Sequence, residues 1–70
     1  MLRRVISSSS IVSIGYEHAT DMLEVEFRQG EIYQFMGVPR SVFDDFLRAP
    51  SKGDFFNARI RDGYRLIRVS

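Results

Sequence analysis

The residues best suited to chemistry lie near the C-terminus, where residues 55–70 carry four basic side chains against one acid: Arg59, Arg61, Arg65 and Arg68. That segment has a net charge of +3, and two more arginines stand at residues 3 and 4. A guanidinium group is a planar fork of donors that suits phosphates, carboxylates and ring faces. One prediction is therefore contact with nucleic-acid phosphates, and the alternative is an ordinary surface of mixed charge.

Two aromatic residues, Tyr33 and Phe35, stand two apart in the β-rich segment Ile32–Met36. Rings exposed on a sheet beside arginines stack on unpaired RNA bases, each base contributing about 1–3 kcal/mol. Rings on the other face of the same strand are core, which a chain of 70 residues needs. Strand alternation does not distinguish the two faces, and the small size of the chain favours the core.

The segment Ala49–Asp54 combines a flexible glycine, a hydroxyl and the ammonium of Lys52 at the start of a helix. Such helix starts bind anions, but Asp54 already supplies a negative charge there, so a capped helix is the favoured interpretation. Asn57 follows on or near the apolar face of that helix. We expect its amide to satisfy backbone groups, and contact with a ligand is the alternative.

Catalytic and metal sites find little support in the composition. The chain has no Cys, which excludes disulfides, thiolate catalysis and Cys-based zinc sites. His18 is the single histidine, and it stands in a polar turn beside Glu17 and Asp21, whereas a specific metal site needs three or four converging ligands. No Ser-His-Asp arrangement is present. We therefore expect no catalytic residue, no metal and no cofactor.

Three strands are predicted from alternating apolar residues, at residues 11–16, 22–27 and 32–36. In the first strand, Val12, Ile14 and Tyr16 are expected to share one face. The connectors are too short for parallel crossovers, so the strands form an antiparallel meander. Residues 2–6 give only a weak extended signal, and we expect residues 1–10 to be less ordered.

Two short helices are predicted after the meander. Pro39 fits the first turn of a helix that runs to about Arg48 or Ala49, and Pro50 ends it. Ser51 caps a second helix, which ends near Gly63, and residues 64–69 return to an extended pattern. The order βββααβ predicts a single α+β domain over residues 1–70, with a three-stranded meander, two helices packed on one face and a C-terminal strand.

In this order the residues resemble the KTSC domain, a short module found at the C-terminus of some lysyl-tRNA synthetases and as stand-alone bacterial proteins. The likeness covers nearly the whole chain and rests on these segments: Ser8 to Ser10 with Ile14-Gly15-Tyr16, Leu23 to Phe27 with Gly30, Tyr33-Gln34-Phe35, Val38-Pro39, Ala49 to Gly53, Phe56-Asn57 and Ile60-Arg61. The central motif of the family is usually Tyr-x-Tyr, so Phe35 keeps the second ring and lacks its hydroxyl. The resemblance implies a role with RNA by analogy with the tRNA-handling enzyme.

The leading prediction is a noncatalytic module that binds RNA or tRNA. Its phosphate contacts are predicted to be Lys52, Arg59, Arg61, Arg65 and Arg68, and its stacking residues Tyr33 and Phe35 where exposed. The alternative is a protein-interaction module that pairs through an open sheet edge, most simply as a weak homodimer. Arginines on one contiguous face would favour nucleic acid, and arginines paired with Glu24, Glu26 and Glu31 would favour a structural role.

The start of the chain and its apolar runs bear on location. Two arginines are followed by Ser7 to Ser10 instead of an apolar run, which is not the pattern of a signal peptide. No apolar run approaches the roughly twenty residues of a membrane-spanning helix. We therefore expect no membrane association and a cytoplasmic location.

Overall fold

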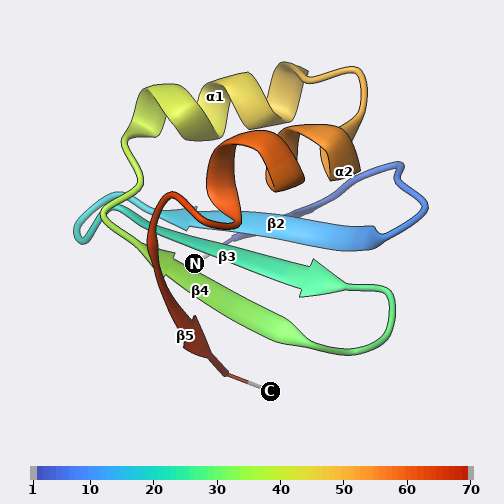
Figure 1. Cartoon of the computed structure of the whole chain (residues 1–70). Coiled ribbons are helices and arrows are strands. Elements are labelled where there is room, and N and C mark those ends of the chain that lie inside the picture. The colour runs from blue at the N-terminus through green and yellow to red at the C-terminus, as the bar shows by residue number, and fades with distance from the viewer. Residues whose placement is uncertain (1, 70) are drawn as a thin grey trace.

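The chain folds into a five-stranded antiparallel sheet with helices over one of its faces (Figure 1). The structure is a computed structural model that describes residues 2–69. The strands are β1 (Arg3–Val5), β2 (Ile11–Glu17), β3 (Met22–Phe27), β4 (Ile32–Met36) and β5 (Arg65–Arg68). The helical layer consists of α1 (Arg40–Arg48) and α2 (Lys52–Phe55), which continues into the π-helical turn η1 (Phe56–Ile60). The strand order is β1-β2-β3-β4-β5, so the chain returns from the helices to place β5 beside β4. The predicted α+β class and the C-terminal strand are confirmed.

The predicted three-stranded meander is incomplete, because β1 precedes it as a fourth strand. β1 pairs antiparallel with β2, with Arg3 opposite Gly15 and Val5 opposite Ser13. All three residues of β1 are exposed, so this strand lacks the buried alternation from which a strand is recognised in a sequence. A polar anchor holds it instead, since Arg3 Nε lies 2.7 Å from a carboxylate oxygen of Glu24 on β3.

The predicted face of β2 needs a correction at its first residues. The register between β2 and β3 shifts between Ile11 and Ser13, which leaves Val12 as the extra residue of a β-bulge. Ile11, which is fully buried, therefore takes the place predicted for Val12 and shares the core with Ile14 and Tyr16.

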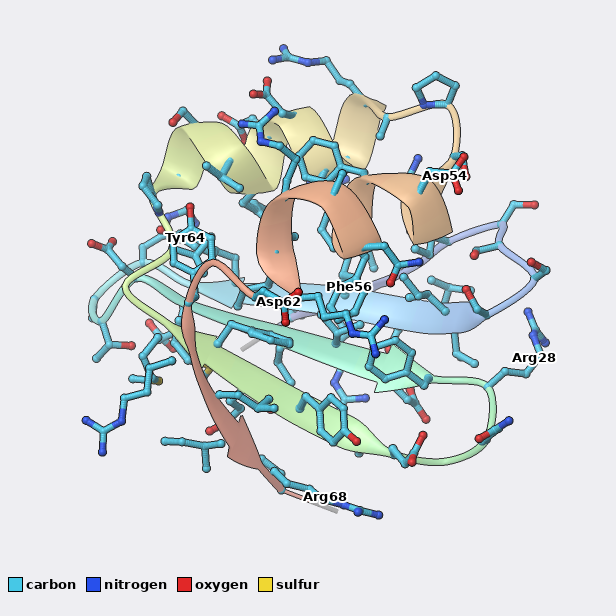
Figure 2. All side chains as sticks on the ribbon, viewed as in Figure 1. Arg28, Asp54, Phe56, Asp62, Tyr64 and Arg68 are labelled. Carbon is cyan, nitrogen blue, oxygen red and sulfur yellow. The ribbon has the colours of Figure 1, made fainter. Side chains whose placement is uncertain are left out.

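The core lies between the sheet and the helical layer. Its fully buried side chains come from strands and helices alike: Ile11, Ile14, Leu23, Val25, Phe35, Val38, Phe46 and Ile60. Phe56 points from the helical layer toward the sheet (Figure 2), where its ring centroid lies 5.2 Å from that of Phe27 and 5.5 Å from that of Phe35. These edge contacts connect the second helix to β3 and β4.

The second helix begins as predicted but does not continue as a regular α-helix. Ser51 Oγ accepts a hydrogen bond from the Asp54 N–H at 3.3 Å, which confirms the predicted N-cap. After Phe55 the helix widens, and the Arg61 N–H donates to the Phe56 carbonyl, five residues earlier, at 2.9 Å. Wide turns of this kind occur often at functional sites. Within residues 2–69, no helix has both the length and the apolar character that crossing a membrane requires.

Candidate functional site

A hollow of about 280 Å³ lies where α2 and η1 meet strands β3 and β4. We call it the Tyr33 hollow. Its lining comes from four separate parts of the sequence: Ser10, Phe27, Glu31, Tyr33, Gly53, Phe56, Asn57 and Arg61. Most of these residues belong to the segments on which the family resemblance rests.

One wall of the Tyr33 hollow is aromatic. The Phe27 ring lies 5.4 Å from the Tyr33 ring in an edge-to-face arrangement. Tyr33 is only half-buried, so part of its ring is accessible. The Arg68 guanidinium lies 6.0 Å from the Tyr33 ring centroid, at the limit of a cation–π contact. The wall therefore combines an accessible ring with a nearby positive charge.

Four polar side chains on the same lining make no hydrogen bond or ion pair with any residue in the range 2–69: Ser10, Glu31, Asn57 and Arg61. A hydroxyl, a carboxylate, an amide and a guanidinium supply both donors and acceptors. Each therefore retains its hydrogen-bonding capacity for a ligand.

Local contacts fix the backbone on two sides of the hollow. The Phe27 N–H donates to the Glu31 carbonyl at 2.8 Å across the turn between β3 and β4, where Gly30 takes a φ of +100°. On the other wall, a Cβ at Gly53 would stand 3.2 Å from Ser10 Oγ. Glycine therefore lets α2 approach the Ser10 segment closely.

The Tyr33 hollow continues into a second hollow of about 410 Å³. The two share Ser10, Phe27 and Glu31, and the second extends over Arg28 and its neighbours. Arg28 stands out from the sheet at the hairpin end of β3 (Figure 2), and its Nη2 donates to the Ser8 carbonyl at 2.8 Å. We call the joined hollows the track, in which Arg61 lines only the first hollow and Arg28 only the second.

The face of the sheet that the helices leave uncovered, here called the open face, carries polar groups that satisfy one another. Arg3 bonds Glu24 at 2.7 Å and Glu26 at 2.9 Å. Ser13 Oγ donates to Glu26 at 2.9 Å, and the Gln34 amide donates to Glu24 at 2.9 Å. These groups hold β1 to β4 together, in contrast to the unpartnered groups of the Tyr33 hollow.

The basic residues predicted as phosphate contacts do not form one contiguous surface. Arg61 and Arg68 lie at the Tyr33 hollow. Arg59 instead lies with its guanidinium 5.2 Å from the centroid of the Phe55 ring, above the helices. Arg65 pairs with Met36 on β4, whose side chain points to the open face. The Arg65 side chain therefore also points to the open face, away from the Tyr33 hollow. Two of the four arginines therefore reach one site.

The other predicted site residues divide in the same way. Phe35 is 1% exposed, so the exposure that stacking requires is absent and its place is the core. Lys52 is half-buried, and its Nζ donates to the Ala49 carbonyl at 2.6 Å, which ties it to the turn between the helices. The prediction that Asn57 satisfies backbone groups is wrong. Asn57 is exposed on the lining of the Tyr33 hollow, with no hydrogen bond to residues 2–69.

Sequence reasoning missed several residues of the track: Ser10, Phe27, Arg28, Glu31 and Phe56. Ser10 entered only through the family resemblance, and Glu31 only as a possible partner of an arginine. Phe27 and Phe56 entered as apolar residues of a strand and a helix and through the resemblance, not as site residues. No spacing in the sequence joins a loop before β2, a hairpin turn and a helix. The sheet and the helical layer bring them together.

A larger groove of about 630 Å³ lies between β1 and α1, and includes Arg4, His18 and Arg40. Its floor is closed by Tyr16, whose hydroxyl donates to the Val38 carbonyl at 2.6 Å and lies 3.1 Å from Asp21. Burial raises the pKa of Tyr16, and the Asp21 carboxylate raises it further. Across the described residues, His, Asp and Glu side chains do not gather in threes as a metal site requires.

Comparisons with known proteins agree with the family resemblance seen in the sequence. The profile of the KTSC domain matches residues 7–64. A lysine–tRNA ligase of Nostoc punctiforme is 39% identical over 62 residues, which cover 89% of this chain and only 11% of the ligase. A protein of Tsukamurella paurometabola is 37% identical over 62 residues, which cover 89% of this chain and 92% of that protein. The crystal structure of a KTSC domain protein from Yersinia pestis superposes with a TM-score of 0.94 at 41% identity, covering 99% of this chain and 97% of the other.

Proposed function

The chain belongs to the KTSC domain family, and from that premise and the geometry of the track we propose that it is a noncatalytic module that binds single-stranded RNA. The observation that carries the proposal is the Tyr33 hollow, in which an accessible ring stands among four polar side chains that have no partner within residues 2–69. An RNA ligand would be met in the cytoplasm, which stays the predicted location.

The chemistry of the hollow matches that of an unpaired nucleotide. A base has a π-face that stacks on Tyr33, and a phosphate accepts from the guanidinium of Arg61. The base edge then meets the amide of Asn57 and the carboxylate of Glu31. Arg68 adds positive charge beside the ring.

The track offers room for more than one nucleotide. The Tyr33 hollow has a volume of about 280 Å³. The adjoining hollow offers room for a neighbouring nucleotide, with Arg28 on its lining. Basic groups on both hollows of a shallow track suit the repeated phosphates of an oligonucleotide.

A relative that handles tRNA by name supports RNA as the partner. In the Nostoc punctiforme ligase, the matching region is part of an enzyme named for tRNA. The chain spans about a tenth of that enzyme, so the activity of the ligase is not expected here.

Fluorescence anisotropy with a labelled single-stranded RNA that contains all four bases, at low salt, tests the proposal. We expect wild-type protein to bind, and Tyr33→Ala to weaken binding by about 5- to 150-fold, which corresponds to one stacked base at about 1–3 kcal/mol. Tyr33→Phe keeps the ring and is expected to keep most of the affinity. No binding by the wild type, or equal affinity of Tyr33→Ala and wild type, would contradict the proposal.

A second candidate function, pairing with a second copy, is favoured by the distribution of exposed apolar residues. Within residues 2–69, the exposed large apolar side chains all lie on or beside the two edge strands: Leu2, Val5, Leu66, Ile67 and Val69. On β5, Leu66 points to the helical side and Ile67 to the open face. A strand from a second copy, paired along the edge of β5, would cover both Leu66 and Ile67, whereas a partner bound to one face of the sheet would cover only one of them.

A cysteine substitution tests this pairing, because the chain has no Cys of its own. Antiparallel pairing about a two-fold axis at Ile67 would bring the two Ile67 Cα atoms to about 4.5 Å, within the range of a disulfide. We expect Ile67→Cys, but not Val5→Cys, to form a disulfide-linked dimer. Added salt is expected to strengthen this dimer, because two copies of β5 bring arginines together, and to weaken RNA binding. A monomer at all salt concentrations would exclude the dimer.

A further inference from the structure

We infer that the Tyr33 hollow selects guanine from the four RNA bases, and that Glu31 is the residue that makes this selection. The inference rests on the proposed RNA binding and adds to it the identity of the base.

A carboxylate is an unexpected group in a site for a polyanion. Glu31 lines both hollows of the track, and its side chain has no hydrogen-bond or ion-pair partner within residues 2–69. Its negative charge repels phosphates, so it lowers affinity for RNA in general. It favours binding only when the ligand places N–H donors against it.

The position of Glu31 is set by the hairpin and not by a ligand. Its carbonyl accepts from the Phe27 N–H, and β4 begins at the next residue, Ile32. Glu31 as a residue is half-buried, and it lines the same hollow as Tyr33. A base stacked on that ring therefore presents its edge within the small volume that Glu31 shares.

Guanine is the base whose edge best matches a carboxylate. Its Watson–Crick edge offers two adjacent donors, the ring N1–H and the exocyclic amino group, which can both bond to the two oxygens of one carboxylate. Adenine and cytosine each place one amino group beside a ring nitrogen lone pair. Uracil has one N–H between two carbonyls. On these three bases a carboxylate that bonds the N–H donor also faces a neighbouring acceptor lone pair, which repels it. On guanine the two donors are neighbours, so both carboxylate oxygens meet an N–H.

The remaining unpartnered groups complement the other side of guanine. Its O6 and N7 are acceptors, and the Asn57 amide and the Ser10 hydroxyl are donors on the same lining, which leaves Arg61 for a phosphate. For the base edge the hollow thus offers one carboxylate, which only accepts, and two residues able to donate, Asn57 and Ser10. This composition follows the donor and acceptor arrangement of guanine more closely than that of any other base.

Four short RNAs test the inference, each an oligouridine whose central base is G, A, C or U. We expect wild-type protein to bind the G oligomer about 5- to 150-fold more tightly than the others, the discrimination of one bidentate contact to a base. Glu31→Gln is expected to bring the four affinities within about twofold of one another. It is also expected to strengthen uridine binding slightly, since a repulsive charge is lost.

Glu17→Gln is the matched control, because it removes the same charge from a residue outside the track. It is expected to keep the guanine preference. Glu31→Gln is expected to keep the melting temperature of the wild type, since only its backbone is engaged in the fold. Equal wild-type affinity for the four oligomers, or a guanine preference that survives Glu31→Gln, would overturn the inference alone. No binding to any oligomer would overturn both this inference and the proposed function.

Discussion

Replacing Arg61 or Arg65 by alanine separates a phosphate contact from a general effect of charge. The two arginines are both exposed, and neither has a hydrogen bond or ion pair within residues 2–69. Each substitution lowers the net charge by one. Arg61 lines the Tyr33 hollow, whereas Arg65 lies on the open face. The pair therefore differs in position and in little else.

The expected magnitude follows from counterion release. Each phosphate contact on a single strand adds about 0.7 to the slope of log affinity against log salt. Loss of one contact in Arg61→Ala is expected to lower the slope by about 0.7, so a tenfold rise in salt weakens wild-type binding about fivefold more than variant binding. Arg65→Ala is expected to keep the wild-type slope.

Anisotropy titrations of a labelled single-stranded RNA that contains all four bases, across a range of NaCl concentrations, give the three slopes. Thermal unfolding of the same samples checks that both variants fold as the wild type does. Equal slopes for Arg61→Ala and wild type would refute the assignment of Arg61 as a phosphate contact. Equal losses in the two variants would show that net charge, and not position, controls binding.

Three further predictions concern the fold. Arg3→Ala leaves the Glu24 and Glu26 carboxylates side by side without their cation and is expected to lower the free energy of unfolding in urea by about 1 kcal/mol. The effect is modest because the Arg3 side chain is 31% exposed and solvent screens its charge. An unchanged urea midpoint would contradict this prediction. The pKa of Tyr16 is raised in the folded state, so the neutral phenol stabilises the fold. This contribution to the free energy of unfolding is complete below the unfolded pKa of 10.0 and is lost as the pH rises through the folded pKa. Tyr16→Phe is expected to lack this alkaline loss when unfolding is measured against pH. Phe46 is fully buried, so Phe46→Ala is expected to cost about 3–5 kcal/mol and to unfold much of this small domain, which circular dichroism would detect; native spectra with an unchanged melting temperature would count against the described core.

Much of the fold could be predicted from the sequence, because its strands and helices carry strong local signals. The apolar alternation of β3 and the prolines on either side of α1 mark their elements without help from the rest of the chain. β1 has no such signal. It is three exposed residues long and depends on pairing with β2 and on the Arg3 contacts, which involve residues distant in the sequence.

The candidate site was harder to predict because it depends on which sheet face the helices cover. Tyr33 and Phe35 point to the same face, yet one is accessible at the end of the helical layer and the other is sealed beneath it. Alternation fixes the shared face and not the coverage. Likewise alternation along a strand predicts that Arg65 and Arg68 point to opposite faces, but it does not show which of the two lies beside Tyr33.

Glu31 and Asn57 illustrate a second limit. An isolated acid in a hairpin turn and an amide on a helix usually have ordinary structural roles. Their importance as candidates comes from the absence of any partner within the described chain and from their shared hollow. Both properties belong to the tertiary structure and cannot be read from spacing.

The most direct test of RNA binding along the track is an NMR titration of isotope-labelled protein with an unlabelled single-stranded RNA. We predict that the amide signals of Ser10, Glu31, Tyr33, Asn57 and Arg61 shift progressively with added RNA, while those of Ser13 and Glu26 on the open face stay in place. An unchanged spectrum at saturating RNA, or shifts confined to the open face, would contradict the account.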